Sequence, residues 1–99
     1  MKPRVGTTLF SATDGTTVVV VRWGSADVDL RCGGAPLLEA PSATPRAADP
    51  ALQDGSGIGK RYTDGAGVEL LCTGSGPGTL TADGRPMSEK ASKPLPASD

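Results

Sequence analysis

The sequence predicts an all-β fold made of two short antiparallel units, with little or no helix. The chain of 99 residues contains 14 Gly and nine Pro but only one Phe, one Trp and one Tyr. Because Gly and Pro end regular elements, this composition is typical of short strands joined by many turns. Residues 13–37 also recur, without a gap, as residues 63–87, with nine of 25 positions identical. The matches fall at turns and strand centres, as expected of a duplicated unit.

The first unit begins with a strand and a turn. Residues 5–12 alternate loosely and end at Thr13-Asp14-Gly15, where Asp and Gly accept positive φ angles. Residues 16–23, TTVVVVRW, are the most β-prone run in the chain. Four consecutive Val leave no polar face, so we expect a central strand that is covered on both sides. It should meet its counterpart from the second unit across a pseudo-twofold axis.

The next strand leads into the first cysteine. In residues 27–38, DVDLRCGGAPLL, alternating apolar residues predict a strand with one buried face, followed by a Gly-Gly-x-Pro turn. Its counterpart in the second half is 78–87, GTLTADGRPM. We therefore assign residues 1–38 to the first unit and 58–87 to the second, within one compact domain. The second series of strands is expected to begin at residues 58–62.

Two segments lack any strand or helix periodicity. Residues 39–57 contain three Pro with scattered Ala and Ser, which is typical of a linker. Residues 88–99 are polar and interrupted by Pro, so they are interpreted as a mobile tail.

The order of features in each unit has a known parallel. In residues 64–87, DGAGVELLCTGSGPGTLTADGRPM, a turn ending in Gly precedes a Val-Glu-x-Leu strand, a Gly-rich loop, a short strand and a Gly-x-Pro-Met turn. Residues 14–37 follow the same order. This order resembles the desulforedoxin-like domain, which also forms the N-terminal part of desulfoferrodoxins and is akin to rubredoxin. With GKRYTD and ELLCTG, the pattern also resembles small actinobacterial proteins. Because desulforedoxin is a dimer, the resemblance implies an internal copy of that dimer.

Desulforedoxin-like units bind one iron or zinc ion through four cysteines, so the resemblance also marks eight ligand positions. These are Ser11, Asp14, Cys32 and Gly33 in the first unit, and Arg61, Asp64, Ala82 and Asp83 in the second. Only one of the eight retains a thiol, so neither unit has the four thiolates of a tetrahedral site. The resemblance thus implies a fold more than a function, and we expect no metal or other cofactor.

Cys32 and Cys72 are the candidate reactive residues, and they are not equivalent within the two units. A free cysteine is most often a small buried hydrophobic residue, and a reducing compartment disfavours a disulfide. Two alternatives are a redox pair and a zinc or iron site whose thiolates are shared across a homodimer. The sequence contains no His, so neither cysteine has the usual base for nucleophilic catalysis.

Lys60, Arg61, Tyr62 and Trp23 are the candidate binding residues. Arg presents a forked donor to carboxylates, and Trp and Tyr concentrate at protein interfaces. The simpler interpretation is a charged edge strand for 60–62 and a core-capping role for the aromatic residues. A phosphate loop at 55–61, GSGIGKR, is disfavoured by its short spacing and by Arg61 in place of Ser or Thr.

The charge balance sets the partners that we expect. Ten Lys and Arg against eleven Asp and Glu give a net charge of −1, which attracts neither nucleic acid nor an anionic membrane. No run approaches the roughly 20 apolar residues of a membrane span, and residues 1–15 lack the apolar run of a signal peptide, so we expect a cytoplasmic protein. The leading hypothesis is a non-catalytic accessory protein that binds another protein. The alternative is a metal-binding or redox protein that uses both cysteines, with a conventional enzyme third.

Overall fold

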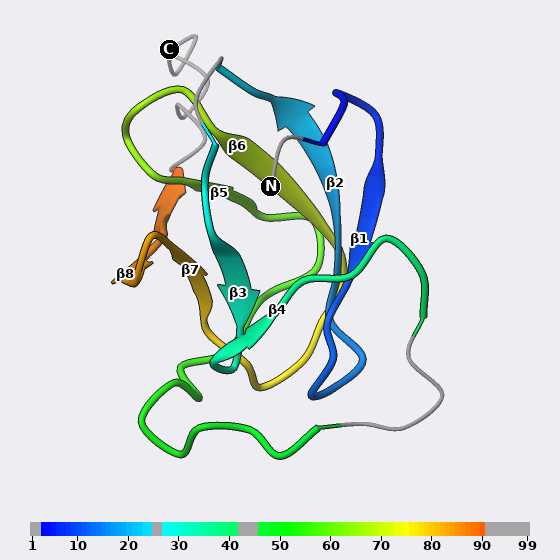
Figure 1. The fold of residues 1–99 in the computed structure, drawn as a ribbon, viewed down its shortest axis with the longest axis vertical. Helices are drawn as coiled ribbons and strands as arrows, with labels where there is room; N and C mark the ends of the chain where they lie inside the picture. Colours follow the sequence, from blue (N-terminus) through cyan, green and yellow to red (C-terminus); the bar gives the residue numbers. More distant parts are fainter. Residues whose placement is uncertain (1–2, 25–26, 42–45, 91–99) are drawn as a thin grey trace, which may run out of the picture.

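Two antiparallel sheets make up the structure (Figure 1). The computed structural model describes residues 3–24, 27–41 and 46–90. Within these ranges the chain forms nine β-strands and no helix, so the predicted all-β class is confirmed. In the described part, no helix is long and apolar enough to span a membrane.

The five-stranded sheet combines strands from both halves of the chain. Its order is β1 (Thr8–Phe10), β2 (Thr17–Arg22), β6 (Glu69–Gly74), β5 (Arg61–Thr63) and β9 (Ser88–Lys90). At its centre β2 pairs with β6, with Val20 opposite Leu70. The two predicted central strands therefore meet in the middle, as expected.

The four-stranded sheet also combines both halves. Its order is β4 (Ala35–Pro36), β3 (Leu30–Cys32), β7 (Leu80–Ala82) and β8 (Arg85–Pro86). At its centre β3 pairs with β7, with Arg31 opposite Thr81. Each outer hairpin closes through two residues with positive φ, Gly33-Gly34 in one and Asp83-Gly84 in the other. Such turns match the twist of the strands that they join, and Asp-Gly is a preferred sequence for them.

The core lies between the two sheets. Its buried apolar side chains come from both sheets and their connections: Leu9, Val18, Val20, Val28, Leu30, Cys32, Leu37, Tyr62, Val68, Leu70, Cys72, Leu80, Ala82 and Met87. On β2 only alternate valines point inward, since Val18 and Val20 are buried while Val19 and Val21 are half-buried. The expectation that this strand is covered on both sides is wrong, because the structure provides only one core layer.

The predicted linker contributes no strand within its described residues, yet hydrogen bonds attach it to the sheet. Residues 46–57 run along the lower end of the molecule in Figure 1, beneath β4. The amide of Asp49 donates to the carbonyl of Gly33 at 2.8 Å, and the amide of Thr79 donates to the carbonyl of Leu52 at 2.9 Å. An antiparallel bridge also joins Ser56 to Gly76. The linker therefore covers one end of the four-stranded sheet.

Two boundaries differ from the sequence prediction. The strand expected at 58–62 is observed as β5, which begins at Arg61. The first three residues of the predicted tail form β9, which pairs with β5. All three are exposed, so no buried face marked this strand in the sequence. Residues 91–99, the rest of the predicted tail, lie outside the described residues.

Candidate functional site

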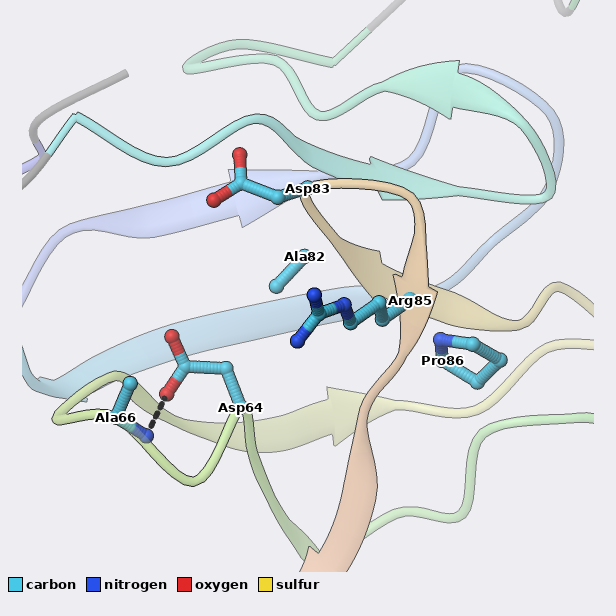
Figure 2. Close-up of a pocket in the computed structure, with 6 residues that line it drawn as sticks. All are labelled: Asp64, Ala66, Ala82, Asp83, Arg85 and Pro86. Carbon is cyan, nitrogen blue, oxygen red and sulfur yellow. Dashed lines mark hydrogen bonds between the residues drawn. The ribbon is translucent and has the colours of Figure 1, made fainter.

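A pocket of about 240 Å³ lies between the turn that precedes β6 and the hairpin of β7 and β8 (Figure 2). Six residues line it: Asp64, Ala66, Ala82, Asp83, Arg85 and Pro86. We call this cavity the Asp64 pocket. Its walls are small apolar side chains, and three charged groups surround its opening.

The carboxylate of Asp64 is held by the backbone of its own turn. Its Oδ1 accepts a hydrogen bond from the amide of Ala66 at 2.7 Å and another from the amide of Val68 at 3.1 Å. Asp at the start of a turn commonly accepts the amide two residues on, so the local sequence suffices to fix this carboxylate. Both bonds use Oδ1, and Oδ2 has no hydrogen-bond partner in the part of the chain that the structure describes.

The carboxylate of Asp83 is fixed across the sheet. The amide of Asp83 donates to the carbonyl of Asp29 at 2.9 Å, and the Oδ1 atom of Asp83 accepts from the amide of Asp29 at 2.9 Å. Asp83 has a φ of 50°, a left-handed conformation that Asp tolerates better than most residues. Its Oδ2 also has no partner within residues 3–24, 27–41 and 46–90.

Arg85 supplies the positive charge of the pocket. It stands on β8 opposite Ala82, and Figure 2 shows its guanidinium to one side of the carboxylates of Asp64 and Asp83. Among the described residues it makes neither an ion pair nor a hydrogen bond. Two carboxylates and one guanidinium leave a local charge of −1, so the site offers acceptors to a cation and a forked donor to an anion.

A related cluster lies at the other end of the fold, around Asp14. Its Oδ1 accepts from the amide of Thr16, and its Oδ2 accepts from the amide of Gly78, both at 2.8 Å. Ser11 Oγ accepts from the amides of Thr13 and Asp14. Partial burial raises the pKa of Asp14, but the hydrogen bonds from Thr16, Gly78 and Ser11 outweigh this and hold it below its usual value.

Cys32 belongs to the same buried cluster, and Cys72 lies on β6. Both are buried free thiols that form no disulfide. Burial raises the pKa of the Cys32 thiol, and the nearby hydroxyls of Ser11 and Thr16 offset this only in part. Burial also raises the pKa of Cys72, whose thiol donates to the carbonyl of Gly74 at 3.2 Å. Both shifts favour the neutral thiol over the nucleophilic thiolate.

No metal centre is visible in the described residues. Nowhere in them do three or more His, Cys, Asp or Glu side chains come close enough together to hold a metal ion. Of the positions matched to metal ligands in the first unit, Ser11, Asp14 and Cys32 do lie together. In the second unit Asp64, Ala82 and Asp83 line one pocket, while Arg61 points elsewhere.

The predicted binding residues are placed on and beside β5. Lys60 forms an ion pair with Glu89 of β9 at 3.0 Å, and Arg61 pairs with Glu69 of β6 at 3.4 Å. Tyr62 is buried, and its hydroxyl accepts from the amide of Gly57 at 2.9 Å. Lys60 and Tyr62 line one open groove with Glu89.

The structure bears on the edge-strand interpretation of residues 60–62 and on the capping role of Trp23. The strand β5 lies between β6 and β9, so it is not the edge strand considered from the sequence; β9 takes that place. Trp23 is half-buried and packs against the core, which agrees with a capping role.

Neither Arg85 nor the Asp64 pocket is predicted from the sequence as a binding site. The available signal was the pair of Asp-Gly turns at 64–65 and 83–84, which predicted turns but not their proximity. That proximity depends on the packing of the two sheets. Compared with known proteins, the chain matches no family model, no curated protein and no solved structure.

Proposed function

We propose that this protein is a non-catalytic accessory protein that acts by binding another protein along strand β9. The observation that carries the proposal is the position of β9 at the end of the five-stranded sheet, paired on one side with β5. Its residues Ser88, Glu89 and Lys90 are all exposed. An edge strand offers main-chain hydrogen bonds to an extended partner segment, a common mode of peptide recognition.

Charged side chains around this edge favour a polar partner segment. Lys90 donates to Glu69 at 2.8 Å and Glu89 accepts from Lys60 at 3.0 Å, so both signs of charge stand beside the strand. The Lys60–Glu89 pair is exposed and contributes little to stability, so a partner's charged groups can replace it at small cost, whereas Lys90 pairs with the buried carboxylate of Glu69. The same charges discourage two copies of β9 from pairing, since Glu89 would face another Glu89.

The proposed ancestry is a duplicated desulforedoxin-like unit that no longer holds metal. Support comes from the register, because Val20 lies opposite Leu70 and Arg31 opposite Thr81. In both pairs the residues are fifty positions apart, which is the offset of the sequence repeat. A twofold relation between two copies pairs equivalent positions in this way.

Site-specific photocrosslinking in the native host tests the proposed function. A photoreactive residue at Ser88 or Lys90 is expected to crosslink one partner protein, whereas the same residue at exposed Arg46 in the linker is not. Identical products from all three positions, or none from Ser88 and Lys90, would contradict binding at β9.

The alternative function is tested on the purified protein. Zinc or iron that copurifies under anaerobic conditions, and is lost in a Cys72→Ser variant, would replace the proposed function by a metal site. Turnover of a substrate that Cys32→Ala abolishes would replace it by an enzyme.

A further inference from the structure

We propose that the Asp64 pocket binds a compact zwitterion, a small molecule that carries both an ammonium and a carboxylate group, as amino acids do. In this arrangement the ammonium lies between the carboxylates of Asp64 and Asp83, and the carboxylate is held by Arg85. The inference goes beyond the proposed binding of a protein at β9 and does not depend on it.

The charges of the pocket select both groups of the ligand. Asp64 and Asp83 each keep one carboxylate oxygen that has no partner within the described chain, so an ammonium can donate a hydrogen bond to both. Arg85 lies to one side of these carboxylates in Figure 2, yet among the described residues it is paired with neither. A simple cation would leave Arg85 without a partner for its charge, whereas a zwitterion satisfies all three charged groups together.

The two carboxylates are fixed before any ligand arrives. Backbone amides of Ala66 and Val68 hold Asp64, and the backbone of Asp29 holds Asp83. Binding therefore needs little further ordering of these side chains. Such preorganisation lowers the entropy cost of binding and so favours affinity. Arg85 is the one charged group that must be ordered by the ligand.

The size of the cavity limits the ligand. A volume of about 240 Å³ lined by Ala66, Ala82 and Pro86 admits a molecule with a short aliphatic chain. This volume is below the roughly 300 Å³ at which the range for drug-sized ligands begins, so the ligand must be smaller than those. A nucleotide or other large cofactor does not fit it.

A titration followed by NMR tests the ligand class directly. The ¹⁵N-labelled protein is titrated with glycine, β-alanine, 4-aminobutyrate and 6-aminohexanoate, which separate the ammonium and the carboxylate by increasing lengths. Butylamine and butyrate supply each charge alone. We expect amide shifts confined to residues 64–68 and 82–86, with at least one amino acid binding about tenfold more tightly than butylamine or butyrate.

Three variants assign the contacts. Arg85→Gln is expected to lower the affinity for the best amino acid to that of butylamine. Asp64→Asn and Asp83→Asn retain a carbonyl oxygen for the backbone bonds, and each is expected to weaken binding about tenfold. Asp54→Asn, which removes an exposed carboxylate outside the pocket, is the matched control and should bind as the native protein does.

Two results would overturn the proposal. One is the absence of shifts in these amides up to about 10 mM of every amino acid in the series, since even weak small-molecule sites are occupied at that concentration. The other is equal affinity for butylamine and for the best amino acid, which would show that Arg85 contributes nothing. The native-like spectrum of each variant establishes that it is folded.

Discussion

The turns at Asp14 and Asp64 begin alike and end in opposite environments. Each carboxylate accepts the amide two residues further on, that of Thr16 in one turn and that of Ala66 in the other. At Asp14 the second carboxylate oxygen is bonded to Gly78 from the other half of the chain. At Asp64 the second oxygen faces an open pocket.

What separates the two ends is the long connection between the halves. Residues 46–57 cover the end of the sheet near Gly33 and bond to it through Asp49. No described segment covers Asp83 and Arg85, which remain exposed. The same local turn therefore becomes a structural anchor at the closed end, where Gly78 bonds to Asp14 and the linker packs nearby, and a candidate binding site at the open end.

The largest difference between the ends is expected for glycine substitutions. A Cβ atom on Gly78 would lie 2.7 Å from Cys32 Sγ and 2.8 Å from Asp14 Oδ2. We expect Gly78→Ala to lower the free energy of unfolding by about 3 kcal/mol, the cost of an overpacked core. At the open end Gly65→Ala meets no atom within 4 Å, and its φ of 78° limits the loss to about 1 kcal/mol.

Urea denaturation measures both effects. Gly24→Ala is the control, because it has an open environment and no positive φ, and should change stability by less than about 0.5 kcal/mol. Equal losses for Gly78→Ala and Gly65→Ala would show that the closed end is not tightly packed.

Replacing each aspartate by Asn should separate the two turns next. Asp14→Asn places an amide NH₂ or a weaker acceptor against the amide of Gly78, so we expect a loss of about 2 kcal/mol, typical of a hydrogen bond to a charged group. Asp64→Asn keeps its carbonyl oxygen for both backbone bonds and should lose less than about 0.5 kcal/mol. Comparable losses in urea denaturation would contradict the different roles assigned to the two residues.

Acid should weaken the closed end in a defined pH window. The folded-state pKa of Asp14 lies below its usual value of 3.8, so the ionised form stabilises the fold fully above that pH. This contribution is lost as the pH falls from 3.8 through the lowered pKa. The stability difference between the native protein and Asp14→Asn, measured by urea denaturation, should therefore shrink in this range. A difference that stays constant with pH would show that the charge of Asp14 is not involved.

The smallest effect is expected at Thr16. Its side chain is 1% exposed, and its hydroxyl lies near Asp14 and Cys32 without forming a hydrogen bond among the described residues. Thr16→Val removes this unsatisfied polar atom. We expect it to raise the free energy of unfolding by about 1 kcal/mol or less, which is measured as a slightly higher thermal midpoint. Ala66→Val, at the exposed position fifty residues later, should have no effect. A clear loss for Thr16→Val would indicate that the hydroxyl is bonded.

Strands and turns can be predicted from this sequence more readily than the burial of their faces or their pairing. The valine run of β2 and the Asp-Gly turns are visible because local preferences determine them. The half-exposed outer valines were not predicted, since four identical residues carry no information about which face is covered. Strand β9 has no apolar residue, so only its pairing with β5 reveals it.

The candidate site was less accessible from the sequence. Cys32 and Cys72 are buried, as expected from the sequence, because burial is the usual state of a free cysteine. Lys60 and Arg61 were interpreted as available charges, yet Glu89 and Glu69 pair with them. The Asp64 pocket arises where a turn before β6 meets a hairpin after it, and neither segment contains a distinctive motif.

The pairing of Val20 with Leu70 has a consequence for how the chain acquires its fold. The central ladder joins segments fifty residues apart, so it cannot form until most of the protein has been synthesised. Until then β2 lacks the strand that pairs with one of its edges, and the core around Val18 and Val20 is incomplete. Chains with such distant pairings fold slowly, and their partly made forms associate through unpaired strand edges. A ribosome-bound chain that ends before Glu69 is therefore expected to depend on chaperones far more than the finished protein does.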